Sequence, residues 1–155
     1  MAMKTKLYAS GKKTLHVLND LIRINIDRIA GCEKAAHIER TPEADLREAY
    51  YRLATDARSY VNDLHAWVIR LGGSPVTQAT ITGKIYLHWL EGKNSFDGSD
   101  SASRLAACQA AGAATEEAYQ HALHDHLTKE LHEMLENQLW ALQRGNKRLH
   151  DLKWP

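Results

Sequence analysis

The sequence of 155 residues lacks several features that would assign it to a particular class of protein. Its two cysteines, Cys32 and Cys108, are too few for a disulfide framework, and neither lies in a Cys-x-x-Cys motif. Lys and Arg number 20 against 19 Asp and Glu, so the net charge of +1 offers little of the attraction to phosphate that nucleic-acid binding needs. We therefore expect two buried, reduced thiols that pack as small hydrophobic side chains, and no nucleic-acid partner.

Long apolar runs and catalytic motifs are also lacking. The uninterrupted apolar runs extend over only a few residues, whereas a helix needs about 20 to cross a bilayer. The N-terminal residues show no apolar stretch of a secretory signal, so we expect a cytoplasmic protein with no membrane partner. There is no Gly-x-Ser-x-Gly motif, no phosphate-binding Gly-rich loop and no dinucleotide fingerprint, and no residue is assigned a catalytic role.

What the sequence does contain is helical periodicity. Apolar or aromatic residues recur at alternating steps of four and three, which is typical of one long helix with a single buried face, at Leu46, Tyr50, Leu53, Ala57, Tyr60, Leu64, Trp67 and Leu71. Looser repeats predict three further helices. The first helix of the chain covers residues 14–39, the third begins near Asp100, and the fourth begins near Thr128.

The expected helix ends carry recognisable signals. Thr41-Pro42-Glu43 combines a capping residue, a proline suited to the first turn and an acid that favours the positive end of the helix dipole. Gly72-Gly73 supplies a left-handed cap after Leu71, and Pro75 prevents the helix from resuming. Two short connections and one long connection therefore separate the four predicted helices.

The long connection decides the topology. Residues 74–98, in which residues 84–90 could form about two helical turns, are numerous enough to travel the length of a bundle. We therefore predict an all-α four-helix bundle of ferritin-like topology, with this crossover between the second and third helices. An up-down-up-down bundle with an inserted loop is the alternative. Residues 1–13 are expected to be a flexible basic segment, and residues 14–155 a single domain.

Several short motifs resemble those of a known family. They are Leu18-Asn19-Asp20-Leu21-Ile22, Asp27 with Gly31 and Lys34-Ala35-Ala36, Leu64 and Val68, Leu71-Gly72-Gly73-x-Pro75, Trp89, Cys108 and Tyr119-x-x-Ala122-Leu123. The chain resembles in these residues the bacterial family of ferritin-like four-helix proteins known as domain of unknown function DUF2383. The resemblance implies a four-helix fold within the ferritin-like group, in a family whose biochemical role is not established.

A ferritin-like fold raises the question of a di-metal centre, which takes Glu-x-x-His pairs from two helices. The chain contains no Glu-x-x-His, and its core faces present Asn25, Thr115 and Gln138 instead. The resemblance also implies Gly-Glu-Asp and Ala-His-Asp in the third and fourth helices, where this chain has Ala111-Gly112-Ala113 and Gly145-Asn146-Lys147. A site of the family would thus have lost its contributions from these two helices. We expect the amides to be buried and to fix helix register.

Acidic and histidine residues leave a metal site open as an alternative. Asp27 and Asp63 are retained from the family pattern, and His121 lies one helical turn from His124 and Asp125, a spacing that can hold zinc or copper if further ligands are supplied. Surface pairing of the acids, and the favourable placement of His near a helix C-terminus, explain the same residues without a metal. We expect no cofactor, with iron, zinc or copper as the alternative.

The predicted first helix carries a second apolar line, formed by Val17, Leu21 and Ile24. Such a face needs a cover, which either the crossover or a second subunit can supply. We predict a non-enzymatic structural or interaction module that forms a homo-oligomer through these residues. The first alternative is a metal-dependent oxidase or metal-handling protein that uses Asp27, Asp63 and histidines such as His65. A second is a small-molecule binder with the Ala-rich face of the third helix as a cavity wall.

Overall fold

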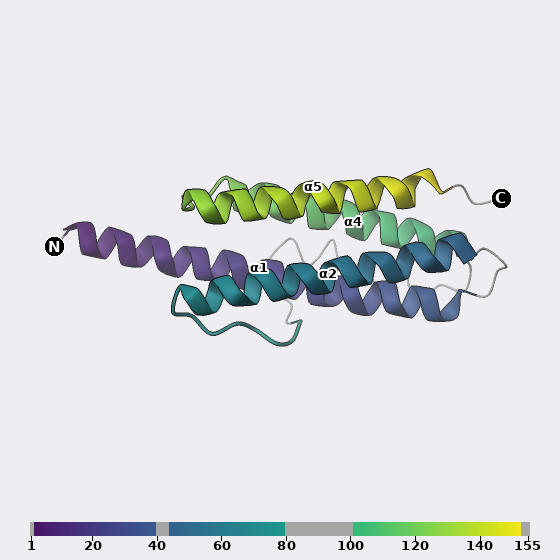
Figure 1. The fold of residues 1–155 in the computed structure, drawn as a ribbon, viewed down its shortest axis with the longest axis horizontal. Helices are drawn as coiled ribbons and strands as arrows, with labels where there is room; N and C mark the ends of the chain where they lie inside the picture. The colour runs from purple at the N-terminus through teal and green to yellow at the C-terminus, as the bar shows by residue number, and fades with distance from the viewer. Residues whose placement is uncertain (1, 40–43, 80–100, 153–155) are drawn as a thin grey trace.

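The protein is a four-helix bundle. A computed structural model describes residues 2–39, 44–79 and 101–152 (Figure 1). These residues form α1 (Ala2–Ile38), α2 (Ala44–Arg70), α4 (Ser101–Leu123) and α5 (Lys129–Asp151), and they contain no strand. The predicted all-α fold class is confirmed. None of the described helices is both long enough and apolar enough to cross a membrane.

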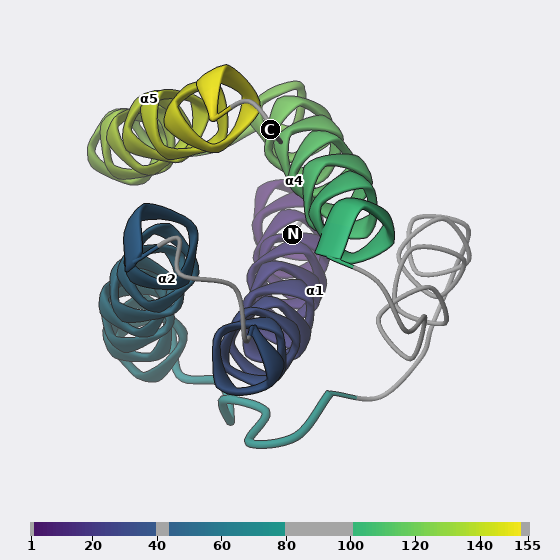
Figure 2. The same ribbon diagram turned by 90° about the vertical axis from the view of Figure 1, so that its right-hand side faces the viewer.

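The helices form two antiparallel hairpins. Helix α1 pairs with α2 and α4 pairs with α5, while α1 also packs against α4 and α2 against α5, which closes a four-sided bundle (Figure 2). Helix α2 ends at one end of the bundle and α4 begins at the other (Figure 1). The connection between them therefore spans the length of the bundle, as the predicted crossover topology requires. Descent from the ferritin-like group stays a prediction.

The helix boundaries agree with the sequence signals at most ends. Gly72 has a φ of 82° and ends α2, and the Gly73 amide donates to the Val68 carbonyl at 2.9 Å, which is the predicted left-handed cap. Thr128 caps α5, where its side chain accepts from the Leu131 amide at 3.4 Å. The Thr41-Pro42-Glu43 cap and the helical turns expected over residues 84–90 lie outside the described residues.

One boundary differs. Helix α1 begins at Ala2, whereas the periodicity placed its start near Thr14. The residues before Thr14 show no apolar periodicity, so the sequence gave no signal of a helix there. A helical backbone can form without an apolar stripe. The division of the chain into a flexible segment over residues 1–13 and a domain over residues 14–155 stays a prediction.

The core consists of two apolar clusters along the bundle. The larger one contains Leu21 and Ile24, whose exposed fractions are 2% and 1%, with Val17 packed against it and half-buried. The single chain therefore already covers the apolar line that was expected to mediate association, which removes the reason for placing a subunit interface at these three residues. Self-association itself stays a prediction.

Candidate functional site

Polar side chains lie inside the bundle in successive levels between α1, α4 and α5, and we call them the polar core. At the first level the Asn25 amide donates to the Tyr119 hydroxyl at 3.0 Å, and Tyr119 donates to Gln138 Oε1 at 2.6 Å. The Gln138 amide in turn donates to the Tyr60 carbonyl at 3.3 Å. All three side chains are buried, so the expectation that Asn25 and Gln138 are interior amides is confirmed.

The second level centres on a buried arginine. The Arg28 guanidinium, 2% exposed, donates through Nη2 to Asn146 Oδ1 on α5. The Asn146 amide donates to the Gly112 carbonyl at 3.0 Å and to Glu116 Oε1 at 2.9 Å. Glycine is needed at position 112 because a Cβ there would come 2.7 Å from Asn146 Oδ1. The asparagine therefore links the positive charge of α1 to the half-buried carboxylate of α4.

The third level is formed by the two cysteines. Cys32 on α1 and Cys108 on α4 are 3% and 4% exposed, belong to the same buried cluster, and lie near enough for each to shift the pKa of the other. The hydrogen bond from Cys108 and the nearby positive charge of Arg28 lower the pKa of Cys32. Burial and the neighbouring Cys32 sulfur raise the pKa of Cys108. The expected burial of both free thiols is confirmed, whereas their pairing was not foreseen.

The fourth level lies at the end of the core. Glu39 is fully buried, and its carboxylate accepts from the Ser101 hydroxyl at 2.5 Å and lies 3.4 Å from Arg104 Nη2. The Arg47 side chain donates to the Glu39 carbonyl oxygen. No sequence pattern pointed to this polar cluster, because its members come from three different helix ends.

Burial also holds the core tyrosines in their neutral form. The pKa of Tyr119 is raised above its usual value, chiefly by burial, although the hydrogen bond from Asn25 opposes this effect. Burial likewise raises the pKa of Tyr60 and of Tyr50. The raised pKa values keep these hydroxyls neutral in the physiological range, and the Tyr119 hydroxyl takes part in hydrogen bonds.

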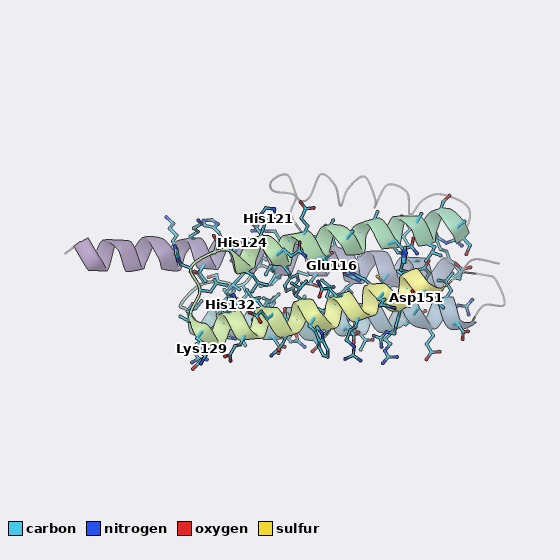
Figure 3. All side chains as sticks on the ribbon, turned by 90° about the horizontal axis from the view of Figure 1, so that it is seen from above. Glu116, His121, His124, Lys129, His132 and Asp151 are labelled. Atoms are coloured by element: carbon cyan, nitrogen blue, oxygen red, sulfur yellow. The ribbon has the colours of Figure 1, made fainter. Side chains whose placement is uncertain are left out.

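The residues proposed for a metal site do not come together. Asp27 is buried in α1, whereas Asp63 is exposed on α2. His121 is exposed on α4 and His124 is exposed just after its end (Figure 3), and Asp125 forms an ion pair with Lys13 Nζ at 3.3 Å. Within the described ranges, no three His, Cys, Asp or Glu side chains are grouped closely enough to hold a metal ion.

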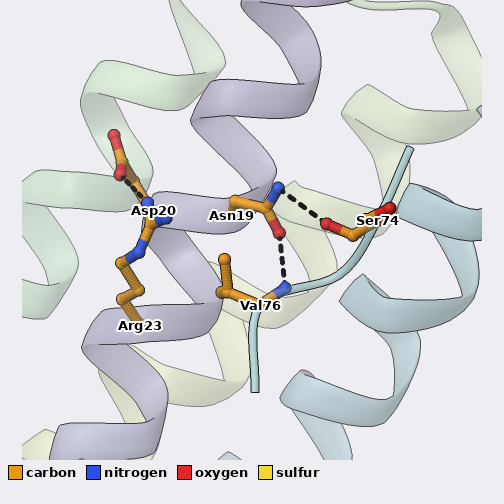
Figure 4. A network of polar contacts seen from close by, with 5 residues as sticks. All are labelled: Asn19, Asp20, Arg23, Ser74 and Val76. Carbon is orange, nitrogen blue, oxygen red and sulfur yellow. Dashed lines mark hydrogen bonds and ion pairs between the residues drawn. The ribbon is translucent and has the colours of Figure 1, made fainter. Parts of the chain in front are cut away.

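A second polar arrangement, which we call the crossover clamp, joins α1 to the chain that follows α2. The Asn19 amide donates to the Ser74 carbonyl at 3.3 Å, and Asn19 Oδ1 accepts from the Val76 amide at 3.0 Å (Figure 4). The Val76 carbonyl lies 3.0 Å from His65 Nε2. A single side chain of α1 thus pairs with the backbone of residues 74–76 as a neighbouring strand would.

A sequence model of the family described as Domain of unknown function (DUF2383) matches residues 13–125. This match covers more than half of the chain. The protein belongs to the DUF2383 family. A comparison with curated proteins finds no match. The matched range of this DUF2383 member includes both halves of the crossover clamp, Arg28 and the cysteine pair, and it stops before α5, which supplies Gln138 and Asn146.

The residues of the polar core do not fit a carboxylate-bridged di-metal centre. The family resemblance matched Glu and His to Gly112 and Asn146, and the structure brings these two positions into contact. The oxygen of Asn146 already accepts from Arg28, and that of Gln138 accepts from Tyr119. A metal cation at this level would lie beside the buried guanidinium, where like charges repel strongly.

Proposed function

We propose that this DUF2383 member is a non-enzymatic, cytoplasmic helical module that acts through its outer surface, with no di-metal centre in its core. The contact between Arg28 and Asn146 carries the proposal. A ferritin-like centre would need anionic ligands at this level of the core. Here the level is filled by a fixed positive charge and a neutral amide. The residues around it serve the packing and register of the helices.

The described surface supports a role in binding. Trp140 on α5 is 62% exposed and stacks under the Arg144 guanidinium at 4.7 Å. Ile69 and Leu71 at the end of α2 are 63% and 39% exposed. Exposed tryptophan and arginine are typical anchors of protein interfaces, whereas the line of Val17, Leu21 and Ile24 is covered. We propose that self-association uses these exposed residues.

The metal content of the protein tests the first part of the proposal. Untagged protein is purified from cells grown with iron, zinc and copper, and its metals are measured by inductively coupled plasma mass spectrometry. We expect substoichiometric metal and a melting temperature that dialysis against a chelator leaves unchanged. Stoichiometric iron or manganese, together with a lower melting temperature after chelation, would overturn the proposal and favour the metal-handling alternative.

Light scattering coupled to size-exclusion chromatography tests the association. We expect an oligomer whose mass falls to that of one chain when Trp140 is replaced by serine. Tyr51→Ser, at a residue 47% exposed on the first half of α2, is the matched control. A wild-type mass of one chain at all concentrations would refute self-association, and an oligomer indifferent to Trp140→Ser would refute this surface as its interface.

A further inference from the structure

The antiparallel register of α1 and α4 brings the two cysteines of the chain face to face. Two contacts fix this register on either side of them: Asn25 with Tyr119 at 3.0 Å, and Glu39 with Ser101 at 2.5 Å. Cys32 lies midway between the two α1 positions, and Cys108 lies between the two α4 positions. The presence of both cysteines in one buried cluster agrees with this register.

The surroundings of the pair favour a thiolate at one sulfur. Arg28 precedes Cys32 by one helical turn on α1, and its guanidinium interacts with the Cys32 sulfur. Arg28 Nη1 is buried and has no hydrogen-bond partner in the described part of the protein, so this side chain retains an unsatisfied donor inside the core. Burial and the neighbouring Cys32 sulfur raise the pKa of Cys108, which favours its protonated form.

We propose that Cys32 and Cys108 are a redox-active pair, in which Cys32 reacts with a small peroxide and Cys108 then closes a reversible disulfide between α1 and α4. This site goes beyond the proposed function and does not depend on it. A pair of free thiols that can close a disulfide is suited to reversible oxidation.

The chemistry balances with hydrogen peroxide as the oxidant. The Cys32 thiolate attacks one peroxide oxygen, an S–O bond forms as the O–O bond breaks, and the departing hydroxide takes up a proton to become water. The Cys108 sulfur then attacks the sulfur of the Cys32 sulfenic acid. An S–S bond forms, the S–O bond breaks, and the hydroxyl group leaves as a second water with the Cys108 proton. Two thiols are thus oxidised by two electrons, and one peroxide is reduced to two waters.

One hollow of the surface reaches a residue of the cluster that holds both cysteines. A hollow of about 380 Å³ opens between the first half of α2 and the last half of α5, and Leu53 and Gly145 are among its lining residues. Leu53 belongs to the same apolar cluster as both cysteines and is 6% exposed. Peroxide is small and uncharged, so a modest displacement of such side chains is enough to admit it, whereas bulky thiol reagents should be excluded.

The test is oxidation of the reduced full-length protein by a molar excess of hydrogen peroxide. Free thiols are counted after denaturation, and non-reducing peptide mapping identifies the linkage. We expect both thiols to disappear together, a linked peptide joining Cys32 to Cys108, and complete recovery with dithiothreitol. The same treatment in guanidinium chloride should give the linkage at least about tenfold more slowly, because the unfolded chain loses both the register and the neighbouring Arg28.

Matched variants separate the two roles. Cys108→Ser should leave a Cys32 sulfenic acid that dimedone captures, and Cys32→Ser should leave Cys108 reduced. Arg28→Gln should slow the oxidation of Cys32 several-fold, and Arg23→Gln, five residues earlier on α1 and paired with Asp20, should not. Circular dichroism checks that each variant is folded.

Three results would overturn the proposal. The first is a folded wild-type protein that keeps both thiols under peroxide. The second is loss of thiols to sulfinic acid or to intermolecular links without the Cys32 to Cys108 peptide. The third is a disulfide that forms equally fast in the folded and the unfolded chain. Each result is read on the wild-type protein, so a variant that fails to fold cannot obscure the answer.

Discussion

Replacing Asn19 by alanine should loosen the start of the crossover. The substitution removes the acceptor of the Val76 amide and the donor to the Ser74 carbonyl, which lie at 3.0 and 3.3 Å. Each hydrogen bond contributes about 0.5 to 1.5 kcal/mol, so Asn19→Ala should lower the free energy of unfolding by about 1 to 3 kcal/mol. The value should approach the upper end if the Val76 amide, which is part-buried, finds no water as a new partner.

The neighbouring residue provides the control. Asp20 is exposed, and its carboxylate forms an ion pair with Arg23 at 2.8 Å on the surface of α1 (Figure 4). Exposed pairs of this kind contribute at most about 1 kcal/mol, so Asp20→Ala should cost about 0.5 kcal/mol or less. Asn19→Asp, which keeps the acceptor for Val76 and loses the donor to Ser74, should fall between the two.

Urea unfolding at neutral pH measures these differences, with the midpoint expected to shift and the slope to stay constant. Hydrogen exchange of the Val76 amide supplies a local readout, because the loss of its acceptor should speed exchange even where global stability changes little. The reasoning would be refuted if Asn19→Ala cost no more than Asp20→Ala and left the exchange of Val76 unchanged.

Three further predictions test the core. Gly73→Ala should destabilise the protein by about 1 to 2 kcal/mol in urea unfolding, because its Cβ would meet Leu15 Cδ2 at 2.5 Å; equal stability would show that Leu15 moves freely. Gly112→Ala and Asn146→Ala should each destabilise, one by a clash at 2.7 Å and one by unpaired donors, and the double variant should cost less than their sum by about 0.5 kcal/mol or more; strict additivity would contradict their contact. Because the pKa of Tyr119 is raised in the folded state, stability should be constant below the unfolded value of about 10 and fall by up to about 1.4 kcal/mol per pH unit above it. Tyr119→Phe should therefore be less stable near neutrality but lose stability less steeply in alkaline melting curves, and an unchanged alkaline slope would refute this assignment.

Local signals in the sequence were sufficient to predict most of the helices of the bundle. The four-three periodicity of α2 reports one buried face directly, and the caps at Gly72 and Thr128 depend only on residues within one turn of them. The interior position of Asn25 and Gln138 followed from the same periodicity. The length of the chain between α2 and α4 then decided the topology.

Contacts between side chains on different helices could not be predicted in the same way. Cys32 and Cys108 lie on different helices, and their pairing depends on a register that no short segment specifies. The same holds for the contact between Arg28 and Asn146, which lies at the level where the family's metal ligands were expected to be missing. Periodicity correctly identified the apolar line that includes Leu21. The subunit interface inferred from this line did not follow, because sequence alone does not show whether the rest of the chain covers a face.

The polar core explains how α4 can be held in one register against α1. Half of the buried residues of α4 are alanine or glycine, and these small residues distinguish poorly between registers that differ by one turn. A shift of one turn would keep alanine against its neighbours, but it would separate Asn25 from Tyr119 and Glu39 from Ser101 at once. Each separation would leave buried polar groups without partners, at a cost of about 1 to 3 kcal/mol per group. Register is therefore specified by the polar levels more than by apolar packing, and the same register places the two sulfurs together.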